Sequence, residues 1–408
     1  MRLRLYLYLS IAVFNFTACE VLTPNAPESK DVLAEPLADL SPEQLKAHLQ
    51  GDEDFAHVFA PSEGLGPIFV SNSCESCHVG DGKGHPVTTL TRFGRSSDSV
   101  GFDHLQSIGG PQLQHRAITG YTPEQIPDEA TGWSQFTPPA VSGLGYIEEL
   151  DDSSIIKLAD PNDLDNDGIS GRLAYINPPE YFVPSSTHIS NSQGQYIGRF
   201  GKKLGAINLL HQIVNAYRED MGITTDYQTN DLVNYQAHDF TSDPISDPEV
   251  SGAVVDLVVF YMKTLKAPTR RDEDDEDVIQ GESLFTTIGC TACHTAKFTT
   301  GESTIQALNK AEFYPYSDFL LHDMGAQLND QYTEGAAEFA EWRTAPLWGI
   351  GLSADSQGGQ LFLLHDGRAS TYEEAIGYHG GEASTSRDAY NALGSSDQGK
   401  IIKFLESL

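Results

Sequence analysis

Two stretches of the chain place apolar residues at helical spacing. In residues 247–265 and 395–408 the apolar positions fall three or four residues apart, on one stripe of a helix. Asp247-Pro248 is a favourable start for the first stretch, because Asp caps helices and Pro suits the first turn. Elsewhere few segments alternate apolar and polar residues as strands do. The pattern predicts a mainly α protein with long loops and few short strands.

A run of charged residues divides the chain. We expect an N-terminal domain at residues 51–268, an acidic linker at 269–277 and a C-terminal domain at 278–408. The N-terminal domain is the longer one. Its extra length, at about residues 100–200, is rich in Pro, Gly and Asp, which predicts a long insertion made of loops.

The first residues have the pattern of an export signal. Two arginines precede an uncharged apolar run at residues 5–17, which is too short to span a bilayer comfortably. A small residue then precedes Cys19, as in bacterial lipoproteins. We expect a signal peptide at 1–18, a lipid anchor and tether at 19–50, and a periplasmic or outer-membrane location. Phe16 is not the usual aliphatic residue of such a site, so a soluble exported form is the alternative.

The charge of the chain limits its partners. It has 25 Lys and Arg against 58 Asp and Glu, a formal net charge of −33. Nucleic acid is excluded as a partner because its binding needs a basic face. The charge would steer a cationic redox protein, or it serves only solubility outside the cytoplasm. We expect contact with a membrane only through the lipid anchor.

Four of the five cysteines stand in two Cys-x-x-Cys-His motifs. The first motif is Cys74, Cys77 and His78, and the second is Cys290, Cys293 and His294. Two disulfides, or one zinc site made of four cysteines, would leave both histidines unexplained. In covalent haem attachment the two thiols add to the porphyrin vinyl groups, and the adjacent His binds iron. The motifs therefore predict two haem c groups per chain. Such attachment takes place outside the cytoplasm, in agreement with the export signal.

The two motifs stand in similar surroundings, which indicates an internal repeat. Phe69 precedes the first motif and Phe285 the second, each by five residues. The segment 281–285 is expected to close a short helix that leads into the attachment loop.

Seven further segments carry a resemblance to a known family: residues 64–69, 137–148, 198–203, 220–224, 321–325, 343–347 and 364–368. Together with the motifs they are similar to the bacterial di-haem oxidoreductases, often labelled thiol oxidoreductases, which are related to the di-haem cytochrome c peroxidases. The resemblance implies two cytochrome-c-like domains face to face. One haem would deliver electrons and the other would react with peroxide.

The resemblance also points to the sixth iron ligand of the C-terminal haem. In the peroxidases an axial Met follows a His-x-Gly segment by fourteen residues. Counted from His365, that place is held by His379. We therefore expect iron to be held by His294 and His379, as suits electron transfer. His322 and Met324 are the competing ligands.

Any catalysis is expected at the haem of His78. His115 is a candidate mobile sixth ligand there. The peroxidases also carry a Glu in a Leu-x-Glu-Gln stretch, which moves a proton as the O–O bond breaks. The matching stretch here has His211 in place of that Glu, so His211 is the expected acid/base, with Glu148 and Glu149 as alternative acids.

Two functions remain open from the sequence. The first is an exported, peroxidase-like di-haem oxidoreductase. The alternative is a di-haem cytochrome that transfers electrons without catalysis. A thiol–disulfide enzyme, which the family label would suggest, fails if both cysteine pairs are consumed by haem attachment.

One acidic segment resembles half of a calcium loop. Asp163, Asp165 and Asp167 stand at alternate positions before Gly168, but the twelfth position is Ala174 instead of Glu. A partial calcium site and a solvated acidic turn are the two interpretations.

Overall fold

The computed structural model describes residues 28, 32–97 and 101–408. The signal peptide and Cys19 lie outside the described residues. Regular structure is mostly helical with short strands, as the hydrophobic pattern predicts. No helix in the described part of the chain is both long and apolar enough to cross a bilayer.

The helices are distributed over both halves of the chain. The N-terminal half has α2 (Pro42–Ala56), α3 (Leu144–Glu148), α4 (Asp152–Ile156), α5 (Leu209–Met221) and α6 (Gly252–Thr264). The C-terminal half has α7 (Glu276–Thr287), α8 (Ser353–Ser356), α9 (Tyr372–Gly377), α10 (Ser384–Ala392) and α11 (Ser395–Ser407).

The strands form small antiparallel sheets. The largest sheet pairs β2 (Leu90–Ser97) with β3 (Gly101–Asp103) and β5 (Gly132–Phe136). The other pairs are β1 (Ile68–Phe69) with β4 (Arg116–Ala117), β6 (Tyr175–Ile176) with β7 (Tyr196–Ile197), β8 (Phe298–Thr299) with β9 (Glu312–Phe313), and β10 (Leu321–Asp323) with β11 (Glu341–Arg343).

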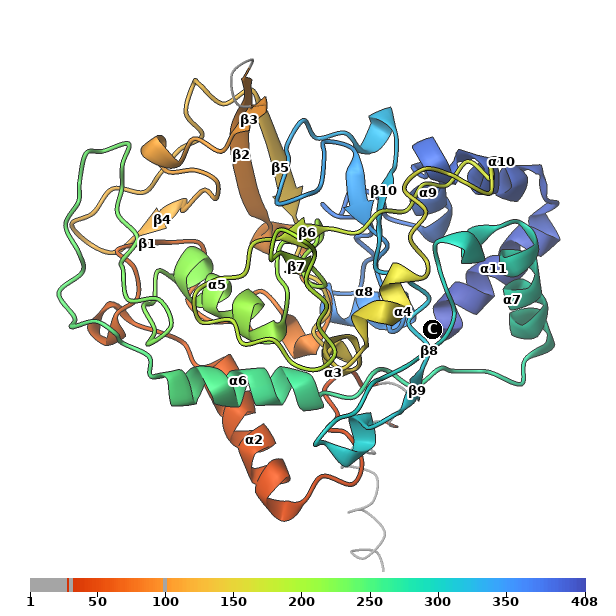
Figure 1. Cartoon of the computed structure of the whole chain (residues 1–408), viewed down its shortest axis with the longest axis horizontal. Helices are drawn as coiled ribbons and strands as arrows, with labels where there is room; N and C mark the ends of the chain where they lie inside the picture. Colours follow the sequence, from red (N-terminus) through yellow and green to blue (C-terminus); the bar gives the residue numbers. More distant parts are fainter. Residues whose placement is uncertain (1–27, 29–31, 98–100) are drawn as a thin grey trace, which may run out of the picture.

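Each half contains one pair of tightly packed helices, α2 with α6 and α7 with α11, which lie toward opposite sides of the molecule (Figure 1). A glycine permits the close approach in both pairs. A Cβ atom on Gly51 would lie 2.2 Å from the carbonyl oxygen of Leu257, and one on Gly281 would lie 2.0 Å from that of Lys400. Any side chain at these positions would overlap the backbone of the facing helix, so only glycine allows the helices to pack this closely.

The glycine is followed four residues later by a phenylalanine in both halves. Phe55 packs on Tyr261 with ring centroids 5.4 Å apart, and Phe285 packs on Phe404 at 5.2 Å. The internal repeat therefore pairs Phe285 with Phe55. The prediction that Phe69 is the counterpart is wrong, because Phe69 lies in strand β1, in extra chain inserted between α2 and the first motif.

Three predicted boundaries differ from the structure. Residues 42–50 belong to α2, so the predicted tether continues into the fold. Helix α6 begins after its N-cap Ser251, later than Asp247. The acidic linker, predicted to end at residue 277, overlaps α7, which begins at Glu276. The start of α11 at residue 395 and a helix through residues 281–285 are confirmed.

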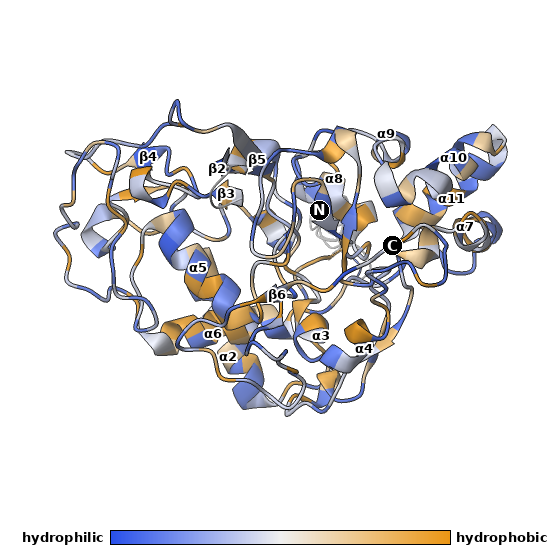
Figure 2. Ribbon diagram, turned by 45° about the horizontal axis from the view of Figure 1, so that its top comes forward, coloured by the Kyte–Doolittle hydropathy of each residue, from blue (hydrophilic) through white to orange (hydrophobic). Residues whose placement is uncertain are grey.

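The largest hydrophobic core joins the two halves. It combines buried residues of α5 and α6 with Phe298, Phe313, Phe319 and Trp348 from the C-terminal half. A second core lies within the C-terminal half, between α7 and α11. Figure 2 shows apolar residues on α2, α3 and α6 where these helices come together. The halves are thus fixed to each other by shared packing.

Replacing Gly281 by Ala should destabilise the protein by about 1–3 kcal/mol, because the new Cβ would overlap the Lys400 carbonyl oxygen. Gly399→Ala, in α11, is the control: nothing lies within 4 Å of its added Cβ, so it should be neutral or slightly stabilising. Urea unfolding measures both. Equal stability of the two variants would contradict the proposed backbone contact.

Candidate functional site

The first Cys-x-x-Cys-His motif closes into a single helical turn. The amides of Cys77 and His78 both donate to the carbonyl of Cys74, at 3.1 and 3.0 Å. The His78 Nδ1 lies 2.8 Å from the carbonyl oxygen of Pro139, and the Phe55 ring lies 6.2 Å from the imidazole. A carbonyl oxygen only accepts, so Nδ1 carries the proton and Nε2 keeps its lone pair.

The second motif repeats this geometry. The His294 amide donates to the Cys290 carbonyl at 2.9 Å, and the His294 Nδ1 donates to the carbonyl oxygen of Tyr316 at 2.8 Å. The Phe285 ring lies 5.9 Å from the imidazole. His294 therefore also presents an unprotonated Nε2.

The donor set of both motifs fits a covalently attached haem. Their four cysteines are free thiols, and the described metal-ligating side chains form no group that joins the two cysteine pairs as a zinc site would. Burial lowers the pKa of both His78 and His294 to about 4, so their rings are neutral, as an iron ligand must be. Burial raises the pKa of the Cys74 thiol to about 12, so that thiol stays protonated.

His379 follows α9, and interaction with its charged form contributes to lowering the pKa of His294. The His379 Nδ1 donates to the carbonyl oxygen of Ala375 at 2.8 Å, which leaves Nε2 with a lone pair. The competing residues have other partners, although the His322 Nδ1 also lies 3.7 Å from the Cys293 Sγ of the second motif. Both ring nitrogens of His322 bond to carboxylates, at 2.8 and 2.7 Å, and Met324 packs against an apolar cluster.

The surroundings of His78 are different. Its neighbours are the Phe55 ring and the Pro139 carbonyl, and the Lys202 charge helps to lower its pKa. Within the described residues no second imidazole makes a ring contact or hydrogen bond with it. His115 is exposed beside β4, so its movement to the iron stays a prediction.

The structure brings His211 and Glu148 to the same place, the start of α5. A Glu148 carboxylate oxygen accepts from the Leu209 amide at 3.1 Å, and the amide of Ile207 donates to the His211 Nδ1 at 3.3 Å. An accepting Nδ1 in a neutral ring puts the proton on Nε2. His211 thus has the tautomer opposite to that of His78 and His294.

His211 lines a cavity of about 300 Å³ at the junction of the two halves. Gln212 and Asn215 line it from the same helix, and the ion pair of Arg92 with Glu334, at 2.9 Å, lines it from two other segments. Burial lowers the pKa of His211 to about 4. Arg92 and Glu334 stand in no motif, so sequence reasoning missed them. Glu148 does not line this cavity, and its carboxylate supports the helix start instead.

A buried ion pair fixes the segment that carries Glu148. Arg199 and Asp152 are both fully buried, and their charged atoms lie 2.7 Å apart. The same guanidinium donates to the carbonyl oxygens of Ile147 and Glu148, at 3.0 and 2.9 Å. The resemblance segment at 198–203 therefore holds the end of the resemblance segment at 137–148.

Comparison with known proteins decides the family. The sequence matches the family described as "di-haem oxidoreductase, putative peroxidase" over residues 17–95 and 125–408. The chain belongs to this di-haem oxidoreductase family. No curated protein matches it. Two solved structures align with the chain at 14% sequence identity. One is a hydrazine synthase of Kuenenia stuttgartiensis, with a TM-score of 0.40 over 95% of both chains. The other is a MauG-like protein associated with microbial copper homeostasis, with a TM-score of 0.38 over 95% of this chain and 94% of that chain.

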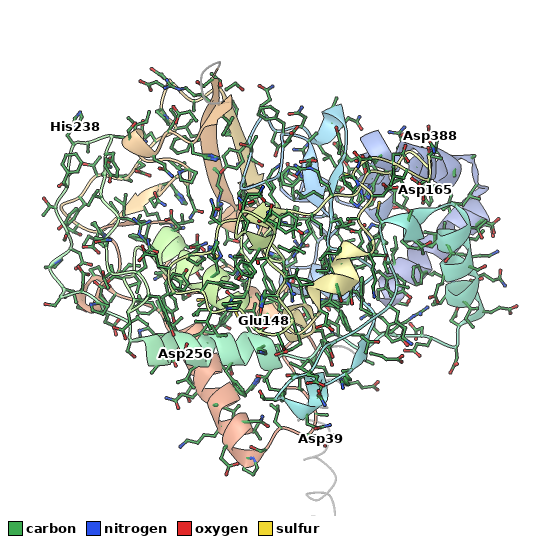
Figure 3. The ribbon with its side chains drawn as sticks, in the orientation of Figure 1. Asp39, Glu148, Asp165, His238, Asp256 and Asp388 are labelled. Atoms are coloured by element: carbon green, nitrogen blue, oxygen red, sulfur yellow. The ribbon has the colours of Figure 1, made fainter. Side chains whose placement is uncertain are left out.

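This di-haem oxidoreductase has an exposed acidic loop at the predicted calcium site. The carboxylate oxygens of Asp163, Asp165 and Asp167 lie within 4.8 Å of one another, and Asp165 is exposed, in the same region of Figure 3 as Asp388. Each of the three accepts a backbone amide of its own loop. These bonds are typical of a solvated turn as well, so calcium binding stays a prediction.

A second acidic group, not found from the sequence, lies in the loops before α6. It consists of Asp231, Asp247 and Glu249, whose oxygens also lie within 4.8 Å of one another. Burial raises the pKa of Glu249 to about 7 and that of Asp231 to about 6, and the charge of Asp247 adds to the rise at Asp231. The group is costly to ionise in the folded protein.

Glu249→Gln is expected to stabilise the oxidoreductase more at pH 8 than at pH 5. The pKa of this carboxyl is about 7 in the folded protein, against an ordinary value of 4.5, so the folded protein keeps the proton to a higher pH than the unfolded chain does. The folded state therefore loses stability as the pH rises from about 4.5 through 7. The variant removes that loss. Urea midpoints at the two pH values measure it, with the exposed Glu129→Gln as control. An equal gain at both pH values would contradict the titration.

Proposed function

We propose that this chain is an exported di-haem c-type oxidoreductase with peroxidase-like chemistry. Haem would be attached through Cys74 and Cys77 with His78, and through Cys290 and Cys293 with His294. A haem held by two imidazoles supplies electron transfer, and one with an open position supplies peroxide cleavage. The matching helix pairs, with their glycine and phenylalanine contacts, support two cytochrome-c-like domains. The acidic surface would suit a cationic redox partner.

The proposal is carried by the unequal surroundings of the two proximal histidines. Interaction with His379 contributes to lowering the pKa of His294, and the His379 Nε2 is unprotonated. Among the described residues, the charge that helps to lower the pKa of His78 is that of Lys202 and not that of a second histidine. Two equivalent bis-His sites would only conduct electrons. The asymmetry therefore supports one electron-transfer site and one reactive site.

In this proposal His211 acts from Nε2 as a hydrogen-bond donor. The cavity that it lines also contains the amide side chains of Gln212 and Asn215 and the Arg92 guanidinium, all of which can donate. Such donors stabilise negative charge that develops on a bound oxygen. Use of His211 as a base would first require loss of the Ile207 hydrogen bond. We therefore propose that His211 stabilises negative charge and does not act first as a base that abstracts a proton.

The test of the proposal begins with haem content. A pyridine haemochrome assay should find two haem c groups per chain. The oxidised protein should then show a high-spin ferric EPR signal that disappears when peroxide is added. Two low-spin signals that do not respond to peroxide would contradict the enzymatic function and leave the electron-transfer cytochrome.

His379→Ala should convert one low-spin ferric signal to high spin, because the haem of His294 would lose its second nitrogen ligand. His238→Asn is the control, since His238 is exposed at the far edge of the N-terminal half (Figure 3), and its spectrum should equal that of the wild type. An unchanged low-spin spectrum in His379→Ala would show that another residue binds this iron.

A further inference from the structure

Four carboxylates gather in the loop between α5 and α6. Oxygens of Asp231, Asp247 and Glu249 lie within 4.8 Å of one another. Asp243 joins this group through its backbone, because its amide donates to the Asp231 Oδ2 at 3.2 Å. The buried Thr224 hydroxyl, just after α5, lies 2.9 Å from the Asp247 Oδ1 and 2.5 Å from the Glu249 Oε2. Both ends of the loop thus contribute to one cluster.

Three oxygens of this group are buried without a hydrogen-bond donor. The Asp243 side chain is only 7% exposed, and its Oδ1 accepts from the Ile245 amide at 2.6 Å. Its Oδ2 is buried and has no partner among the described residues, and the same is true of the Asp231 Oδ1 and the Glu249 Oε1. A buried carboxylate oxygen without a donor is costly, so three of them in one cluster indicate a bound ligand.

The protein itself does not balance these charges. In the described part of the chain, no lysine, arginine or histidine forms an ion pair with any of the four carboxylates. Burial raises the pKa of Asp243, and the charge of Asp247 adds to the rise. Bound water would donate hydrogen bonds to the unpaired oxygens but would leave the carboxylates repelling one another. A cation would satisfy the oxygens and neutralise the charge together.

The donor atoms determine which type of ion would bind. Carboxylate and hydroxyl oxygens, with no nitrogen or sulfur among them, suit Ca²⁺ or Mg²⁺ and not zinc or copper. Mg²⁺ requires a regular octahedron and keeps several waters, whereas Ca²⁺ accepts irregular sets of carboxylates. We propose that Asp231, Asp243, Asp247 and Glu249 form a Ca²⁺ site, in which the Thr224 hydroxyl holds two of the ligands in place.

The site would tie a long loop to the two helices that flank it. Residues 225–249, all of them described, contain neither helix nor strand. A cross-link through an ion stabilises such a segment because it offsets the entropy of closing the loop. The exposed loop at 163–167 differs, since its three aspartates accept amides of their own loop and none of their oxygens is buried without a partner. The buried group is therefore the better calcium site.

Calcium should reverse the sign of the Glu249→Gln effect at mildly alkaline pH. In chelator-treated full-length protein the variant should have the higher urea midpoint, because it lacks a carboxyl that is costly to ionise. With about 1 mM Ca²⁺ the wild type should gain stability through binding and exceed the variant. Calorimetric titration with Ca²⁺ should show an affinity lower by about tenfold or more in Glu249→Gln and Asp231→Asn. Asp165→Asn, in the other acidic loop, is the matched control and should bind as the wild type does.

Several outcomes would overturn the site. One is a wild-type urea midpoint that is the same with Ca²⁺ and with chelator. Another is a calcium-dependent gain that persists in Glu249→Gln and Asp231→Asn but is lost in Asp165→Asn, which would place the ion in the loop at 163–167. An equal gain from Mg²⁺ at the same concentration would contradict the assignment to calcium. If Glu249→Gln does not accumulate, Asp231→Asn carries the same test. Haem content enters none of these measurements, so their failure leaves the proposed function untouched.

Discussion

The chemistry of this protein depends on one type of hydrogen bond, from a histidine Nδ1 to a backbone carbonyl. It fixes the tautomer of His78, His294 and His379, and leaves each Nε2 with a lone pair. For His379 the carbonyl lies one helical turn away and comes with local structure. For His78 the carbonyl belongs to Pro139, 61 residues further along the chain. The tautomer of His78 therefore depends on a distant loop being held in place.

The two halves of the fold hold their motif histidines in place by different means. Each half has the same crossing of two helices, made by a glycine and an aromatic pair, and the phenylalanine of this crossing lies beside the histidine of the Cys-x-x-Cys-His motif. In the C-terminal half, α7 leads almost directly into the motif. In the N-terminal half, extra chain intervenes, and the long loops pack on residues of the other half. The first site is thus a product of the whole chain, whereas the second is built mostly within its own half.

The sequence predicted what local pattern can encode. The two attachment motifs, the mainly helical class and helix α11 follow from short spacings, and the family resemblance pointed to His379. Sequence reasoning failed where contacts between distant segments determine the structure. Phe69 matched Phe285 by its distance from cysteine, yet Phe55 is the counterpart, because what matters is the crossing at Gly51. The tautomer of His211 could not be foreseen either, since it depends on a single backbone amide.

Exposed charges and interior charges would act on the haems over different distances. The chain as a whole carries −33, and a uniformly negative surround would favour ferric iron in both haems. Screening limits this effect, because at physiological ionic strength exposed charges act over about 8 Å. Half-buried cations such as Lys202 and Arg343 are screened much less than exposed carboxylates. Interior charges near a haem would therefore weigh more in its redox balance than an equal number of exposed carboxylates.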